Sequence, residues 1–367
     1  MKNDSVYTRI LRTFANSPVA GPLVTLLGVS VLFLLIAPNF ASWRTVSGII
    51  TAVSISGFVT IGITLLMIAG EFDLSIAPMI AMSGYLFGSI STGADTLITR
   101  TLLSWGLPIS EGHFAFAILF AVAVPALMGL FNGLLLVWTN IPSFIITLGT
   151  RQIFRGLVWV VAGAELLQVL DKPVLYEIFN GRFDLLNDFI KATFIDLESK
   201  ARVNFRTATL WLIGAAIFFQ YVLMRTPFGN HLFAAGGNPA AAVAQGVRTA
   251  RTKLFAFVIS GFLAGVAGII QFSQFRSVRV AEQAGIELTA IAGAVVGGAL
   301  LTGGYGSVWG ALIGVLIISV LRSGVILYKF PLTGEPIIAS DNFEAIVGVT
   351  IIAAVILNNY LRSRATS

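Results

Sequence analysis

The sequence predicts an all-α polytopic membrane protein with about ten transmembrane helices. Hydrophobic residues make up 56% of the 367 residues and charged residues only 11%, whereas soluble domains carry roughly 25% charged residues. The mean hydropathy of +0.90 agrees with this contrast. Apolar runs of about 18 to 25 residues recur along the chain, and each is long enough to cross a hydrocarbon core of about 30 Å.

The apolar elements follow one another across residues 20–361, which we expect to form one transmembrane domain. The first element follows basic residues, as in a signal peptide, but no small-residue cleavage site closes it, so we expect an uncleaved span. The elements 75–92 and 287–301 are short and rich in small residues, and we expect them to be broken or only partly spanning. The predicted elements are 20–37, 47–69, 75–92, 114–138, 142–163, 208–224, 253–272, 287–301, 306–328 and 343–361.

The distribution of charge predicts the orientation. The segment 225–253 holds four Lys/Arg and no Asp/Glu, whereas the segment 164–206 holds six Lys/Arg and seven Asp/Glu. Because basic residues are retained on the cytoplasmic side, we expect 1–19, 225–253 and 362–367 to be cytoplasmic. Both termini then lie in the cytoplasm, and 164–206 forms a long loop on the opposite side.

Composition also excludes several classes of function. The net charge of +6 needs no nucleic acid, because basic cytoplasmic segments account for it. The absence of cysteine excludes disulfides and thiolate metal sites, and two histidines, His113 and His231, form no familiar zinc pattern. The sequence contains neither a P-loop nor a G-x-S-x-G elbow. We therefore expect a chain that is not an enzyme and that binds no metal or cofactor of its own.

Glycines at a spacing of four residues predict close helix packing. The pairs are Gly84 with Gly88, Gly129 with Gly133, Gly261 with Gly265, Gly293 with Gly297, and the series Gly306, Gly310 and Gly314. In lipid, such small-residue faces let two helix backbones approach closely. We assign no ligand to them.

Acidic residues interrupt the apolar sequence at two similar places. The first is Gly70-Glu71-Phe72-Asp73-Leu74-Ser75-Ile76, and the second is Gly285-Ile286-Glu287-Leu288-Thr289-Ala290-Ile291. Each carries a carboxylate, a leucine and a hydroxyl residue before a short apolar element. Matched interruptions in two halves are typical of a repeated, often inverted, transporter unit, so we predict an internal inverted repeat.

Two interpretations of these polar residues stay open. A carboxylate at membrane depth costs about 2.5–3.5 kcal/mol, so it must face water, protein or a partner. Asp73 or Ser75 either caps the start of a broken helix or contacts a solute, whereas Glu71 is expected at the water boundary. The cations Arg151, Arg155 and Arg322 either form ion pairs and reach the interface, or line a solute path.

The segment Gly237-Asn238-Pro239-Ala240-Ala241-Ala242-Val243-Ala244-Gln245-Gly246-Val247-Arg248 predicts a short capped helix in water. Asn238 is a favoured N-cap, Pro239 suits the first helical position, and Gly246 fits the C-terminal stop. The spacing of Ala240, Ala244 and Val247 predicts one low-relief face. The helix is either an ordinary interfacial helix or a surface that docks in a partner's groove.

Four ordered stretches resemble one transporter family. Gly237-Asn238-Pro239 through Gly246-Val247, followed by basic residues, resembles the coupling segment of ABC importer permeases of the monosaccharide branch. Residues 70–76 are similar to the family's G-x-x-D-L-S, and Asn140-Ile141-Pro142-Ser143-Phe144-Ile145-Ile146-Thr147-Leu148-Gly149 is similar to its P-x-F-I-x-T-L-G. Residues 287–314 resemble its E-L-x-A-I-A…GG…GG-x-G…G-x-L-I-G block. Together these stretches cover most of residues 45–328.

The resemblance implies an all-α permease domain over 20–361 in a bacterial inner membrane. It implies a dimer with a second permease chain, which is a copy or a paralogue, a periplasmic solute-binding protein, and separate ATPase subunits that use ATP and magnesium. It implies that the ATPase docks on the coupling helix, carried by Asn238, Pro239, Ala240, Ala241, Ala244 and Gly246. The residues that it places at the solute path or at helix breaks are Asp73, Ser75, Phe144, Glu287 and Thr289.

Departures from the family pattern leave the solute open. Glu71-Phe72 stands where many sugar permeases have Gly-Ile, and Thr289 stands where Asp is common. The long, mixed-charge segment 164–206 suggests a docking site for a periplasmic partner. The alternative function is an ion- or proton-coupled secondary transporter, in which Asp73 or Glu287 would bind the coupling ion.

Overall fold

We analysed a computed structural model, which describes residues 19–162, 167–169, 174–194, 203–278, 285–328, 345, 347–350 and 352. The described residues are mostly helical, with one two-stranded sheet of two residues per strand. The helices are α2 (Ala20–Ile36), α3 (Trp43–Ile68), α4 (Ile76–Thr92), α5 (Leu97–Ser104), α6 (Phe114–Thr139), α7 (Ser143–Ala162), α8 (Val174–Asn180), α9 (Asp184–Phe194), α10 (Ala208–Arg225), α11 (Pro227–Gly237), α12 (Pro239–Ala244), α13 (Thr249–Phe275), α14 (Ile286–Val296) and α15 (Val308–Leu327). The strands are β1 (Leu167–Gln168) and β2 (Ser277–Val278).

Each predicted apolar element from 20–37 to 306–328 coincides with one of these helices. Within the described part of the chain, six helices are long and apolar enough to span a membrane, namely α3, α6, α7, α10, α13 and α15. The helices α2, α4 and α14 are apolar but shorter. The element 343–361 lies almost entirely outside the described residues, so the count of about ten spans is not confirmed. The structure supports a multi-pass membrane protein.

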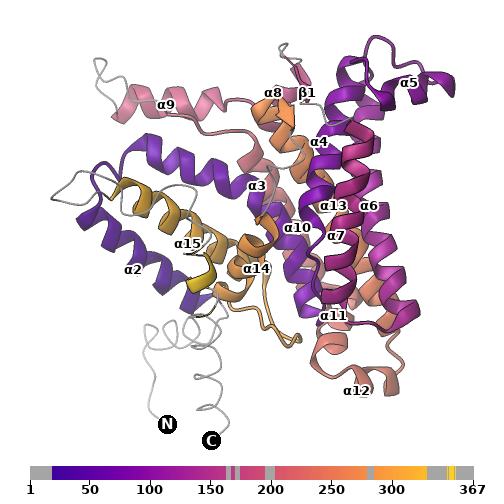
Figure 1. Ribbon diagram of the computed structural model, residues 1–367. Coiled ribbons are helices and arrows are strands. Elements are labelled where there is room, and N and C mark those ends of the chain that lie inside the picture. Colours follow the sequence, from indigo (N-terminus) through magenta and orange to yellow (C-terminus); the bar gives the residue numbers. More distant parts are fainter. Residues whose placement is uncertain are drawn as a thin grey trace, which may run out of the picture.

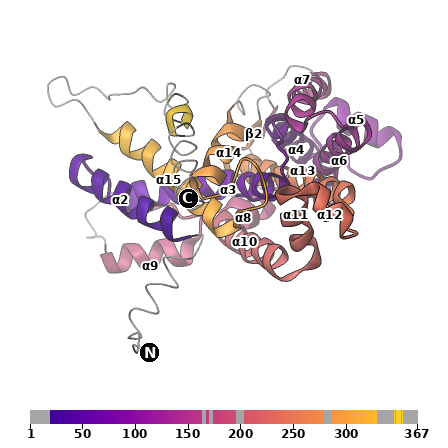
Figure 2. The same cartoon turned by 90° about the horizontal axis from the view of Figure 1, so that it is seen from below.

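Helix α3 lies at the centre and joins two groups of helices. It packs against α13 on one side and against α14 and α15 on the other. Helix α13 also packs against α4 and α6, and α15 packs against α2. Figure 1 shows α12 at one end of the bundle and α5, α8 and β1 at the opposite end. Seen from below in Figure 2, α11 and α12 lie on the same side of α3 as α6 and α13.

The glycine spacing predicts close helix packing, and the structure confirms it between α6 and α13. A Cβ on Gly261 would overlap the carbonyl of Pro125, and a Cβ on Gly129 would overlap the carbonyl of Phe257. Glycine is required at both positions because the two backbones touch. Helices α6 and α13 therefore touch each other, and α4 packs against both of them.

The two short apolar elements differ in their surroundings. Every residue of α4 from Ile76 to Ser91 is buried, so this helix is enclosed by protein rather than by lipid. Helix α14 has 11 residues and rises about 16 Å, roughly half of the hydrocarbon thickness. The described helix is therefore too short to cross the hydrocarbon core by itself, and partial spanning of the 287–301 element stays a prediction.

Candidate functional site

The short helix α12 forms as its sequence predicts. Oδ1 of Asn238 accepts a hydrogen bond of 3.0 Å from the amide of Ala241, and Pro239 occupies the first helical position. Gly246, with φ of +80°, ends the helix in the left-handed region. Its amide donates to the carbonyl of Val243 at 2.9 Å, and the next amide, of Val247, donates to Ala242 at 3.0 Å. These two bonds form a Schellman cap, so α12 is closed at both ends by local interactions.

One face of α12 points away from the bundle. Ala242 is buried against the protein, whereas Ala240, Ala241 and Ala244 are exposed. The prediction that Val247 shares this face is wrong, because α12 ends at Ala244 and the chain then turns at Gly246. The exposed surface of α12 also includes Val243, which is 58% exposed, and the helix lies at the end of the bundle shown in Figure 1.

The break between α3 and α4 begins with a second Schellman cap. The amide of Gly70, with φ of +81°, donates to Met67 at 2.9 Å, and the amide of Glu71 donates to Leu66 at 2.9 Å. The last carbonyl of the helix, at Ile68, accepts a hydrogen bond of 2.9 Å from the amide of Gly304. A helix terminus has carbonyls without an intrahelical partner, and here the turn between α14 and α15 supplies one.

Asp73 and Ser75 fix the start of α4 inside the protein. Oδ1 of Asp73 accepts hydrogen bonds from the amide of Ser75 at 2.9 Å and from its hydroxyl at 2.6 Å. The Ser75 hydroxyl also accepts from Nδ2 of Asn132 on α6 at 2.7 Å. All three residues are buried. The carboxylate therefore holds the first turn of α4, while the side chain of Ser75 caps no amide of its own helix. Sequence reasoning missed Asn132, although a lone amide in the apolar element 114–138 is a usable signal.

Glu71 lies in an ion pair with a lysine from a distant part of the chain. Nζ of Lys253 on α13 donates to Oε1 of Glu71 at 2.6 Å, and the two side chains are 22% and 9% exposed. The start of α13 packs over the break and supplies the cation, and the position of Glu71 at the water boundary stays a prediction. A carboxylate removed from water needs such a partner. The signal in the sequence is the carboxylate itself, which does not identify the cation.

Glu287 is paired with a second cation. Its Oε1 lies 2.7 Å from a guanidinium nitrogen of Arg151 on α7, and its side chain is fully buried. For Arg151 the structure favours the ion-pair interpretation. Thr289 donates through its hydroxyl to the carbonyl of Gly285 at 3.1 Å, which stays within the first turn of α14. Glu71 and Glu287 are thus paired with cations on different helices, α13 and α7, while α4 and α14, which follow the two acidic interruptions, contact each other.

Helix α7 packs through a narrow stripe and exposes the rest of its surface. Ile146, Thr150, Phe154 and Val158, spaced by four residues, are buried. Phe144 is 54% exposed on this helix. The exposed surface also carries Gln152 and Arg155. The same surface exposes Ile145, Ile153 and Val160, so most of it is apolar. Because a charged side chain facing lipid is costly, the part of this surface around Arg155 favours contact with water or with another protein.

The segment predicted as a long loop over 164–206 contains β1, α8 and α9, and its described part is fixed to the bundle. Strand β1 pairs antiparallel with β2, with Leu167 opposite Val278. On α8, Nδ2 of Asn180 donates to the carbonyl of Ile270 at 3.0 Å. The hydroxyl of Tyr176 lies 2.7 Å from that of Ser91. Burial raises the pKa of Tyr176, and the hydrogen bond to Ser91 opposes that rise.

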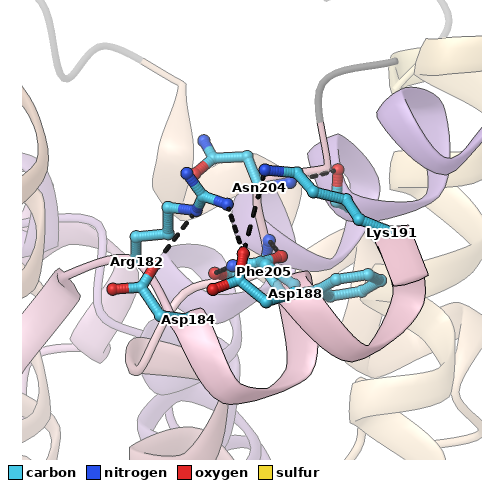
Figure 3. Close-up of polar contacts among 8 residues, drawn as sticks. Arg182, Asp184, Asp188, Lys191, Asn204 and Phe205 are labelled. Atoms are coloured by element: carbon cyan, nitrogen blue, oxygen red, sulfur yellow. Dashed lines mark hydrogen bonds and ion pairs between the residues drawn. The ribbon is translucent and has the colours of Figure 1, made fainter. Parts of the chain in front are cut away.

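The solvent face of α9 carries a group of ion pairs, shown in Figure 3. Arg182 contacts Asp184 at 3.1 Å and Asp188 at 3.2 Å, and Lys191 lies 3.8 Å from Asp188. On the inner side, the buried Asn187 accepts from the amide of Phe205 and donates to its carbonyl, both at 2.9 Å. The amide pair anchors α9 to the chain before α10, while the charges stay accessible.

Comparisons with known proteins agree on one family. Residues 45–355 match the family described as "Branched-chain amino acid transport system / permease component". The chain is 28% identical over 340 residues to the ribose import permease protein RbsC of Bacillus subtilis (strain 168), covering 92% of each chain. It is 28% identical over 341 residues to the L-arabinose transport system permease protein AraH of Escherichia coli (strain K12), covering 93% of this chain and 90% of that one. It is 29% identical over 329 residues to the autoinducer 2 import system permease protein LsrC of Yersinia pestis (strain Pestoides F), covering 88% and 81%. No solved structure gives a significant match.

Proposed function

The chain belongs to this family of permease components and is the permease subunit of an ABC importer, for which we propose a monosaccharide or a related sugar or polyol as the solute. The relatives are named for ribose, L-arabinose and autoinducer 2, and small hydroxylated solutes of this kind suit a path lined by a few polar groups. Permease components are not enzymes, so the hydrolysis of ATP, with its magnesium ion, belongs to a separate ATPase subunit.

The observation that carries the proposal is the exposed face of α12. A six-residue helix is too short to be stable by itself, yet this one is capped at both ends and presents Ala240, Ala241 and Ala244 to the outside. A preformed surface of small side chains fits a groove on a partner protein. We assign the ATPase subunit to this surface, with Asn238, Pro239 and Gly246 holding its shape.

Orientation follows from the charge around α12. Arg225, Arg248, Arg251 and Lys253 flank the helix, and the segment 225–253 contains no carboxylate. The positive-inside rule therefore supports a cytoplasmic α12 and cytoplasmic termini in a bacterial inner membrane. The opposite end, with α8 and the accessible ion pairs of α9, then faces the periplasm. This end is our assignment for the solute-binding protein.

The exposed face of α7 is our assignment for the solute path. It carries Phe144, Gln152 and Arg155, and its Arg151 joins the path to Glu287 on α14. A second permease chain, either a copy or a paralogue, would close this face across a two-fold axis. Asp73, Ser75 and Thr289 support the breaks in α4 and α14. Binding of ATP would move α12 and rock the two groups of helices, which exposes the path to each side in turn.

Uptake into proteoliposomes tests the proposal. The chain would be reconstituted with its ATPase subunit and binding protein, and radiolabelled D-ribose and L-arabinose would be supplied outside with ATP inside. We expect uptake that needs ATP and stops when the Walker lysine of the ATPase is replaced. Uptake by the permease alone, driven by a sodium or proton gradient, would instead establish the alternative of a secondary transporter.

A further inference from the structure

The segment that carries α12 contacts the α3–α4 break at two points, one before and one after the helix. Before α12, Gly236 near the end of α11 is buried against Ile68 at the end of α3. After α12, Lys253 on α13 binds Glu71 at 2.6 Å. The helix itself makes few contacts with the bundle, and these two contacts link its flanking segments directly to the break.

The first contact is made by backbone alone. A Cβ on Gly236 would overlap the carbonyl oxygen of Ile68 and would lie 2.7 Å from the amide nitrogen of Gly304. A Cβ on Gly303 would lie 2.9 Å from Cα of Gly70 and 3.0 Å from Cα of Gly236. Four glycines from three parts of the chain, Gly70, Gly236, Gly303 and Gly304, thus meet without side chains between them. We name this cluster the glycine junction.

The glycine junction joins both discontinuous regions of the fold. Gly70 ends α3 directly before α4, and Gly303 with Gly304 forms the turn between α14 and α15. The 2.9 Å hydrogen bond from Gly304 to Ile68 ties that turn to α3. Gly236 packs on the same carbonyl. Close-packed backbones cannot slide without losing contact along their whole length, so a displacement of α11 moves all three parts together.

The second contact is electrostatic. Glu71 is nearly buried, and Lys253 is its cation. Separating the pair would leave a carboxylate without its counter-charge in a site of low dielectric, which is costly. The chain therefore contacts the break on both sides of α12. Before the helix the contact is backbone packing at Gly236, and after it the contact is the ion pair of Lys253.

We propose that the glycine junction and the Glu71–Lys253 pair form one rigid unit that transmits the displacement of α12 to the α3–α4 break and to the α14–α15 turn. Glu71 and Lys253 are positioning residues in this unit, because they act through their contact with each other, which holds α13 to the start of the break. The proposal rests on the function proposed above. It predicts that disturbing the unit uncouples ATP hydrolysis from transport.

Two helical glycines provide a matched experiment. Gly236→Ala places a methyl group on the Ile68 carbonyl, whereas a Cβ on Gly214, in the middle of α10, meets no atom within 4 Å. Both variants would be assembled with the ATPase subunit and binding protein in proteoliposomes. We would measure the ratio of ATP molecules hydrolysed to labelled L-arabinose or D-ribose molecules transported. The thermal unfolding midpoint of each permease would be measured as well.

We expect Gly236→Ala to raise the ATP hydrolysed per sugar by about 5- to 150-fold, the range of a coupling free energy between two sites. Gly214→Ala should behave as the wild type does. Normal coupling in a folded Gly236→Ala variant would overturn the proposal. Equal loss of coupling in both variants would also overturn it, because the close backbone contact would then not be the cause.

The ion pair provides a second arm if Gly236→Ala does not assemble. Lys253→Glu should uncouple transport, and the exchange Glu71→Lys with Lys253→Glu should restore coupling because it restores the opposite charges. An uncoupled exchange variant with a normal unfolding midpoint would overturn the proposal. Failure of the proposed function is distinguishable, since in that case the wild-type complex would show no ATP-dependent uptake at all.

Discussion

The guanidinium of Arg151 on α7 lies 2.7 Å from Oε1 of Glu287 in the first turn of α14. The carboxylate is fully buried, whereas the arginine side chain is 28% exposed. The pair therefore joins α7, whose exposed face is largely apolar, to α14, which is too short to cross the membrane by itself. Its arginine partly faces the region that we assign to the solute path.

Replacing Arg151 with methionine should destabilise the permease by about 3–5 kcal/mol, because a buried carboxylate loses its cation. The double variant Arg151→Met with Glu287→Gln should recover most of this loss, since no buried charge remains. Arg155→Met, one turn further along α7 at an exposed position, is the matched control. Thermal unfolding in detergent measures all three. If the destabilisation of the double variant equals the sum of the effects of the two single substitutions, the pairing is contradicted.

Replacing Ser75 with alanine should cost about 1–3 kcal/mol, the penalty for leaving buried polar partners without a hydrogen bond. The Ser75 hydroxyl donates a hydrogen bond to Asp73 and accepts one from Asn132. Its loss therefore removes contacts of both α4 and α6. Ser104→Ala is the control, because that exposed hydroxyl bonds only within its own helix. Equal unfolding midpoints for the two variants would rule out a structural role for the buried network.

Replacing Asn238 with alanine should weaken α12 by about 1 kcal/mol, because the 3.0 Å cap to the amide of Ala241 is lost. Hydrogen exchange of the α12 amides should become faster, while exchange in α13 stays unchanged. Asn238→Asp keeps an acceptor and should preserve protection. Faster exchange in the aspartate variant to the same extent would show that the cap is not the cause.

Replacing Ala244 with glutamate should prevent docking of the ATPase subunit, because a charged side chain would be buried without a partner in the interface. We expect ATP-driven uptake to fall by at least about tenfold, which corresponds to about 1.4 kcal/mol, with an unchanged unfolding midpoint. Ala244→Ser keeps a small side chain and should retain uptake. Co-purification of the ATPase subunit with the glutamate variant at wild-type yield would refute the docking surface.

Replacing Asn187 with alanine should destabilise the anchored α9 by about 1–3 kcal/mol, since two buried hydrogen bonds to Phe205 are lost. Replacing Arg182 with alanine removes only exposed ion pairs, which contribute about 0–1 kcal/mol. Thermal unfolding compares the two. Should the Arg182 variant unfold as early as the Asn187 variant, the inner anchor would not be the dominant contact.

The sequence alone is sufficient for features that depend on near neighbours. The apolar elements are recognisable because hydropathy adds up along one helix, and α12 is recognisable because each of its caps involves residues within a few positions. The family motifs, read in order from residue 70 to residue 314, identify the class of transporter. These predictions need no knowledge of which helices touch.

Most of the missing predictions concern contacts between distant parts of the chain. The cation partner of Glu71 was not predicted, because nothing near Glu71 in the sequence identifies Lys253, which is 182 positions away. The face with Val247 was extrapolated past the actual end of α12. Asn132 and Gly236 have ordinary neighbours in the sequence, and their roles depend on what packs against them.

The sequence by itself determined where helices form, where α12 is capped and which family the chain resembles, because hydropathy and capping act over a few residues. Only the tertiary structure decided which cation pairs with each buried carboxylate and which glycines touch. Those outcomes depend on the faces that α3, α7, α11, α13 and α14 turn toward one another. The packing that places Lys253 over Glu71 and Gly236 on Ile68 is a property of the whole bundle, since each contact needs two backbones fixed by many other contacts.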